Sequence, residues 1–410
     1  MRATLMPVAT LLLSVAILLM GNGLQGVLLP IRAGIEVFST FDIGIMGSSY
    51  YVGFVIGCFL GVRIVRRVGH VRAFTAMVSI ASTIALLHAL LPVPALWWIF
   101  RAATGFCFAT LFMIIESWLN EKATNQTRGK IFSVYTIINL TVVTLGQLMV
   151  TLHDPASFPL FALASILVSL AAVPVALSTS PAPEPIKQKA FSLTHLFRVS
   201  PVGLVGCFAV GLTNGGFWAL APVFAQAIGL TTTGVALFMS TTVIGGAIGQ
   251  WPLGFASDQI DRRKVIIFAC LGSIAASAAM IVFDDLWVRG ILIFAFLFGI
   301  FAFPLYSLSA AHMNDFVEPD EFVQASSGLL LMFGIGAVIG PLVAAAAMTQ
   351  LGPDGLYIFV LAIHLALAAY TVRRLFARPP PPEEERVAFA DSLRSVQTVM
   401  PLEPTAQNPD

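Results

Sequence analysis

Residues 20–30 read MGNGLQGVLLP, and residues 212–222 read LTNGGFWALAP. Placing one stretch over the other at a spacing of 192 residues aligns Asn22-Gly23 with Asn214-Gly215, and Pro30 with Pro222. Apolar composition alone would not bring an amide, a glycine and a proline into register in this order. Each stretch also lies inside an apolar run of more than the roughly 20 residues that a membrane helix needs. The chain is therefore predicted to be a membrane protein built from two copies of one unit.

Further pairs of unlike residues keep the same register at spacings of 192 to 194 residues. The second half repeats Gly53, Gly57 and Gly105 as Gly245, Gly249 and Gly299, and repeats Asn120-Glu121 as Asn314-Asp315. Two copies with a site between them at mid-depth can rock and expose that site to each side in turn. The duplication is thus a physical argument for transport.

The composition indicates that lipid is the solvent for most of the chain. The 410 residues are 58% hydrophobic and 10% charged, with a mean hydropathy of +0.89, whereas soluble domains carry about 25% charged residues. A water-soluble globule of this length could not hide so much apolar surface. A soluble enzyme is excluded, and the formal net charge of +1 offers no basic field for nucleic acid.

We predict an all-α polytopic membrane protein, because backbone that crosses lipid must satisfy its own hydrogen bonds. Twelve spans are expected, at 7–30, 42–62, 72–91, 95–118, 130–152, 157–178, 201–226, 233–254, 264–283, 288–311, 323–348 and 355–376. They form two parallel six-helix repeats, since each half has an even number of spans. The predicted domains are an N-terminal bundle (1–178), a cytoplasmic linker (179–200), a C-terminal bundle (201–378) and a disordered cytoplasmic tail (379–410).

Basic residues predict the orientation. All but three of the 22 Lys and Arg residues fall on one side of the predicted bundle, the exceptions being Arg32, Arg101 and Arg289. By the positive-inside rule both termini are cytoplasmic.

Phosphate-loop, dinucleotide and metal-ligand patterns are absent, so no cofactor and no metal are expected. The expected partners are the lipid bilayer, a small-molecule substrate and a coupling proton, and we expect a monomer.

The loops after spans two and eight carry a family resemblance. The second loop reads Gly254-Phe-Ala-Ser-Asp258-Gln-Ile-Asp261-Arg262-Arg263, and span four carries Arg101-Ala-Ala-Thr-Gly105. With twelve spans in a 6+6 repeat, these motifs resemble the major facilitator superfamily over residues 5–376. The first loop departs from the pattern, because Arg66 stands where the family has an acid. Gly146-Gln147 likewise replaces the Gly-Pro of drug exporters, and Ile115-Glu116-Ser117 resembles a bacterial branch whose members mostly lack an assigned substrate.

The resemblance implies a secondary transporter of the bacterial inner membrane that works by rocker-switch alternating access, with proton coupling as the family default. Few intramembrane acids are present, which favours a neutral or weakly anionic metabolite, for example a vitamin-like heteroaromatic such as riboflavin. One alternative is a multidrug or metabolite exporter of the same fold. Another is a membrane receptor or scaffold that transports nothing. The family also implies that Asp258, Arg262 and Arg263 act in gating.

Charges inside a span are costly, so each is a functional candidate. Arg101 is expected to bind an anionic group or couple to a proton carrier, or else to snorkel to the surface or bond backbone carbonyls of the first span. Glu116 is a proton-coupling candidate, or it joins Arg128 or Lys130 in a cytoplasmic charge network. Asp42 is a weaker proton-site candidate, for which helix capping is the alternative.

Amides and aromatic residues inside the spans suggest a polar binding site. A buried amide needs partners, which either a substrate cavity or an interhelical hydrogen bond supplies. The substrate-binding candidates of this kind are Asn22, Gln25, Asn139, Asn214, Trp218 and Tyr306. Glycines such as Gly245, Gly249, Gly336 and Gly340 are expected either to let the halves slide or to serve static packing.

Overall fold

The computed structural model describes residues 8–123, 127–177, 192–283, 290–318, 321–377 and Phe389. Within these ranges the chain is helical without strands, and twelve helical segments are long and apolar enough to span a membrane. The first half contains α2 (Ala9–Ile35), α3 (Thr40–Val68), α4 (His70–Leu90), α5 (Pro94–Lys122), α6 (Arg128–Leu148), the 3₁₀ helix η2 (Met149–Leu152), α7 (Pro159–Leu170) and α8 (Ala172–Ala176). The second half contains α10 (Pro201–Ala227), α11 (Thr232–Gln259), α12 (Arg262–Phe283), α13 (Ile291–Ala302), α14 (Pro304–Asn314), α15 (Phe322–Leu351) and α16 (Gly355–Ala377). The predicted fold class and number of spans are confirmed.

Helix α3 is longer than the sequence predicts. It begins at a capping box made by Ser39 and Asp42, and it continues to Val68, where Gly69 takes a left-handed φ of 85°. Arg66 and Arg67, predicted to lie in a loop, therefore belong to the last turn of the helix. Basic side chains are favourable at a helix C-terminus, and only glycine adopts this φ without strain. A hydropathy window ends the span too early because it scores these arginines as loop.

The two halves repeat the same backbone contacts. Gly105 packs so closely on α3 that an added methyl group would meet the carbonyl oxygen of Tyr50, and Gly299 stands in the same relation to Thr242. Gly23 lies against the backbone of Val143 in the first half, as Gly215 lies against Ala337 in the second. All four pairs follow the 192–194-residue spacing of the sequence. The duplication is therefore visible in the packing as well as in the sequence.

These glycine contacts lie within halves and not between them. Gly245 and Gly249 face the backbone of α13, while Gly336 and Gly340 face the backbone of α10. For these residues the structure favours static packing over a sliding interface. Glycine contacts that do cross between the halves join Gly44 and Gly47 to Pro341, and Gly334 to Val55.

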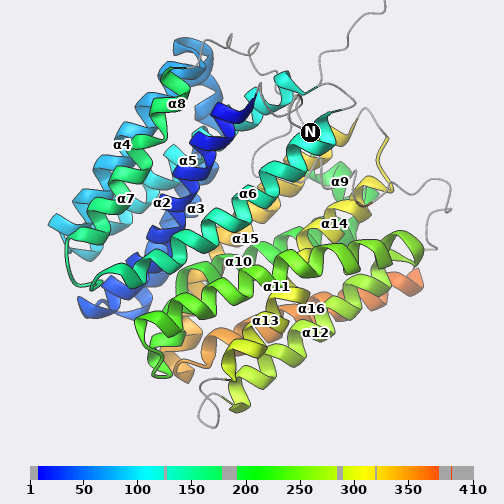
Figure 1. The fold of residues 1–410 in the computed structure, drawn as a ribbon. Helices are drawn as coiled ribbons and strands as arrows, with labels where there is room; N and C mark the ends of the chain where they lie inside the picture. Colours follow the sequence, from blue (N-terminus) through cyan, green and yellow to red (C-terminus); the bar gives the residue numbers. More distant parts are fainter. Residues whose placement is uncertain are drawn as a thin grey trace, which may run out of the picture.

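The two halves converge at one end of the molecule and diverge at the other (Figure 1). At the end where they converge, which we call the narrow end, α3 and α15 meet through Gly44 and Ala345, and α2 and α10 meet through Gly34 and Gln226. The opposite end, where α3 ends in Arg66-Arg67 and α12 begins with Arg262-Arg263, is called the basic end. In Figure 1, α6 and α11 lie close together toward the narrow end and separate toward the basic end.

Most of the predicted linker and tail lies outside the described residues. The described end of the linker forms the short helix α9 (Leu193–Val199), in which His195 lies 3.3 Å from Glu321. Within the predicted tail, Phe389 is described and is buried, at 5% exposed. Its ring packs on Gly254, and its backbone N–H donates a hydrogen bond of 2.8 Å to the Asp258 carboxylate. The other residues of the predicted tail lie outside the described part, so the expectation of disorder stays a prediction.

Candidate functional site

A cavity of about 520 Å³ lies between the two halves. Its wall is built from α2, α3, α5 and α6 of the first half and from α10, α11, α14 and α15 of the second. Sites for small molecules usually have volumes of about 300–1,000 Å³ and combine apolar walls with a few polar groups. By size and position, this central cavity is the candidate binding site.

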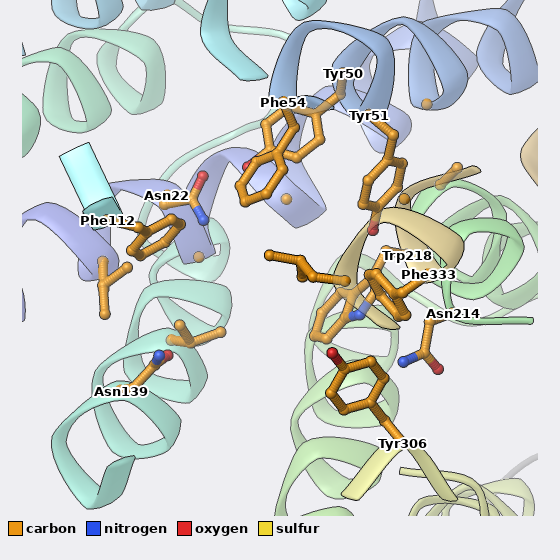
Figure 2. A pocket seen from close by; sticks show the side chains of 18 of the residues that line it. Asn22, Tyr50, Tyr51, Phe54, Phe112, Asn139, Asn214, Trp218, Tyr306 and Phe333 are labelled. Atoms are coloured by element: carbon orange, nitrogen blue, oxygen red, sulfur yellow. The ribbon is translucent and has the colours of Figure 1, made fainter. Parts of the chain in front are cut away.

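All seven substrate-binding candidates line the central cavity. They are Asn22, Gln25, Arg101, Asn139, Asn214, Trp218 and Tyr306. Figure 2 shows Asn22 and Asn139 on one side of the cavity, with Trp218 and Tyr306 on the other. The side chain of Gln25 is 2% exposed, and neither the oxygen nor the nitrogen of its amide has a hydrogen-bond partner among the described residues. The side chains bring amides and aromatic rings from both halves to one space.

Arg101 is the one charged side chain in the described lining of the central cavity. Its guanidinium lies over the ring of Tyr50, with the Cζ atom 4.4 Å from the ring centroid. A cation over an aromatic face is stabilised by the quadrupole of the ring. Gly53 and Gly105 make this possible, because they bring α3 and α5 into backbone contact beside the pair.

The halves are joined near the narrow end by polar as well as apolar contacts. The Ser240 hydroxyl of α11 donates to the Gln147 amide oxygen of α6 at 3.4 Å. Eleven residues toward the basic end on each helix, Trp251 and Thr136 lie on the same faces, because eleven residues make about three turns. Both side chains are exposed, Trp251 at 77%. With the separation of α6 and α11 toward this end in Figure 1, the exposure indicates that the two faces are apart at the basic end.

Two of the acidic candidates lie outside the lining of the central cavity. Asp42 caps α3: Ser39 donates from its backbone and hydroxyl to the carboxylate, at 3.2 and 2.6 Å. This favours the capping interpretation. Glu116 is buried in α5, at 4% exposed. The Arg128 and Lys130 side chains lie outside the described part, so the charge network with Glu116 stays a prediction.

The gating candidates form ion pairs at the basic end of the second half. Arg262 is 2% exposed and donates from Nε to Asp315 at 2.7 Å, and its terminal nitrogen lies 3.2 Å from Asp258. Arg263 pairs with Asp261 at 2.6 Å and donates to the backbone carbonyl of Arg374 at 3.1 Å. Burial raises the pKa of Asp261, but the hydrogen bonds and charge of Arg263 outweigh it and hold that pKa below its usual value. These contacts tie α11, α12, α14 and α16 together within one half.

Several lining residues were not predicted as binding candidates, and the repeat could have found two of them. Phe112 occupies the position equivalent to Tyr306, and Phe333 the position equivalent to Asn139, each at a spacing of 194 residues. Phe54 and Phe303 complete the aromatic wall and carry no signal that distinguishes them from packing residues. Applying the repeat to each candidate would therefore have widened the predicted site.

Comparisons with known proteins agree with this architecture. The model of the Major Facilitator Superfamily matches residues 11–283 and 203–403. The uncharacterized MFS-type transporter YcaD of Escherichia fergusonii is 24% identical over 361 residues, which cover 87% of this chain and 93% of that protein. The crystal structure of the nucleoside transporter NupG has a TM-score of 0.76 at 13% identity, covering 89% and 98% of the two chains. A bacterial homologue of the human lysosomal transporter Spinster, in an inward-facing and occupied conformation, has a TM-score of 0.72 at 13% identity, covering 93% and 97%. The chain belongs to the major facilitator superfamily of membrane transporters.

Proposed function

We propose that the protein is a secondary active transporter that moves a small, planar organic metabolite across the bacterial inner membrane by alternating access. The observation that supports this most directly is the central cavity, which both halves line and which the narrow end closes. With the basic end in the cytoplasm, as the positive-inside rule predicts, the described state is open to the inside.

The lining supports a flat cargo with several hydrogen-bonding groups. Amides recur around the central cavity, and Trp218 and Tyr306 offer ring faces on which a heteroaromatic body can stack. A vitamin-like heteroaromatic such as riboflavin fits this chemistry. The fold does not identify the cargo, because solved transporters that are 13% identical to this chain share its architecture and not its binding residues.

We further propose that a proton gradient drives transport. Glu116 is the candidate carrier, because it is buried in a span and a carboxylate there is costly unless it is functional. Asp258 and Arg262 are proposed to act in gating, since closing the basic end would bring α11 toward the first half. A pH gradient imposed across the proteoliposome membrane should then change the initial rate of cargo uptake. If that rate does not depend on the gradient, the proposal of proton coupling is wrong.

An exporter of drugs or metabolites is the second candidate, favoured by the apolar, aromatic share of the lining. The two candidates differ in phenotype. Deleting the gene for an exporter makes cells sensitive to dyes without a nutritional defect, whereas deleting the gene for an importer creates a requirement for the cargo.

The alternating-access mechanism can be tested without a known cargo by disulfide cross-linking. The pair Gln147→Cys and Ser240→Cys should cross-link in the described state, because the native side chains touch across the halves. The pair Thr136→Cys and Trp251→Cys should cross-link only after the basic end closes. The four native cysteines are buried, so their background reaction should be small.

The two cross-links should exclude each other. A molecule locked at positions 147 and 240 should fail to form the second bond, and either lock should stop flux through proteoliposomes. If both bonds formed in one molecule, or if locked protein still moved a cargo identified by a thermal-shift screen, alternating access would be wrong.

A further inference from the structure

The charge of the central cavity is not balanced by the protein. Among the described lining residues there is one cation, Arg101, and no Asp or Glu. No carboxylate in the described part of the chain lies within ion-pair distance of Arg101, and its buried Nε has no hydrogen-bond partner there. The ring of Tyr50 stabilises the guanidinium but cannot neutralise it.

Three other arginines with little exposed surface do have a carboxylate partner among the described residues. Arg262 pairs with Asp315, Arg263 pairs with Asp261, and Arg32 pairs with Glu36 at 2.5 Å. A charge held inside a membrane bundle is retained where a partner or a function compensates its desolvation. Arg101 departs from these three, and it lines a cavity in which a ligand could supply the missing charge.

Arg101 also lies deep in the central cavity. It is seven residues from the start of α5 at the narrow end, and Tyr50 is ten residues from the start of α3 there, which places both about 10–15 Å from that end. Gln25 is ten residues from the narrow end of α2, and both of its amide atoms lack partners among the described residues. A cation and an amide donor thus lie near the closed end, with the aromatic residues Trp218 and Tyr306 elsewhere in the lining.

We propose that the cargo is a small planar monoanion, whose carboxylate or equivalent acidic group binds Arg101 and whose aromatic body lies among the rings of the central cavity. A guanidinium presents a fork of donors that matches a carboxylate, and Tyr50 holds one face of that fork. This inference rests on the proposed function, because it names the class of molecule that the transporter moves. It narrows the earlier choice between neutral and weakly anionic cargo to the anion.

Pairs of ligands that differ only in charge test the proposal. Indoleacetate and indoleacetamide share a ring and a side chain, as do nicotinate and nicotinamide, and only the acids are anionic at neutral pH. Purified protein in detergent should be stabilised against heat by an acid at a concentration about 30-fold lower than by its amide. In Arg101→Gln this preference should disappear, while binding of the amide persists and shows that the variant is folded.

Two further variants sharpen the result. Arg101→Lys keeps the charge without the planar fork and should retain only part of the preference. Asn139→Ala removes a neutral group from the same lining and should weaken acid and amide alike. The proposal is overturned if no acid stabilises the wild type, if acid and amide bind equally, or if the preference survives in Arg101→Gln.

The binding test and the transport test fail separately. If the acid binds through Arg101 but is not carried into proteoliposomes, the charge proposal stands and the transport proposal fails. If the amide is carried as well as the acid, transport stands and the charge proposal fails.

Discussion

The two halves of the molecule share their packing and differ in their chemistry. Gly105 meets Tyr50 as Gly299 meets Thr242, so the helix pairs α3–α5 and α11–α13 are built alike. The position equivalent to Arg101 is Ala295, however, and the position equivalent to Asp258 is Arg66. Among the described contacts, Arg101 of the first half therefore carries the charge of the central cavity, and Asp258, Arg262 and Asp315 of the second half form an ion-pair network at the basic end.

The difference shows which features duplication constrains. Contacts between backbones depend on small residues at fixed spacing, and both copies need them in order to fold. A binding group is needed only once, in the central cavity between the halves, so either copy can supply it. Contacts that both halves share should therefore respond alike to mutation, and contacts that only one half has should not.

The largest effect is expected from breaking the buried ion pair of the second half. Asp315→Asn leaves Arg262 with less compensation in a site that is 2% exposed, and loss of one partner of a buried pair costs about 3–5 kcal/mol. The equivalent change, Glu121→Gln, affects an exposed residue and should cost little. Thermal unfolding followed by tryptophan fluorescence would compare them, and equal losses would contradict the asymmetry.

The next effect should be the same in both halves. Gly105→Ala and Gly299→Ala each place a methyl group against a carbonyl oxygen, and overpacking of this kind costs about 1–3 kcal/mol. Gly26→Ala is the control, because nothing lies within 4 Å of its added methyl group. The yield of monodisperse protein and its melting temperature would show the losses. A strong effect in one half only would argue against equivalent packing.

A smaller effect on stability is expected at the contact between the two halves near the narrow end. Gln147→Ala removes the acceptor of the Ser240 hydroxyl, a net contribution of about 0.5–1 kcal/mol to the closed narrow end. The population should shift toward closure of the basic end, so the Thr136→Cys, Trp251→Cys cross-link should form about two to five times faster. An unchanged or slower rate would mean that this hydrogen bond does not favour the described state.

The smallest effect concerns pH. The pKa of Asp261 is lowered in the folded state, so its stabilising contribution is complete above the ordinary value of about 4 and is lost as the pH falls through the lowered pKa. Melting temperatures measured from about pH 5 to about pH 3 should fall less steeply in Asp261→Asn than in the wild type. Lys264→Gln, which changes the next exposed cation along α12, should keep the wild-type slope.

Fold and site were predictable to different depths. Hydropathy and repeat spacing gave twelve helices and two copies, because membrane length and backbone contact both leave strong sequence patterns. Asn22, Asn214 and Arg101, which line the central cavity, could be singled out because polar groups are rare inside spans. Phe54 and Phe303 were not, because a phenylalanine that lines a cavity and one that packs in a core look the same in sequence. Helix ends such as Arg66-Arg67 were missed because dipole and capping effects override hydropathy.

The exposure of Trp251 has a practical consequence. The indole is 77% exposed in the described state, and the proposed closure of the basic end would bring it against α6 and change its emission wavelength. With the other tryptophans replaced by phenylalanine, this side chain becomes an intrinsic optical reporter. Turnover could then be followed in unlabelled protein in real time, before any radioactive cargo is available.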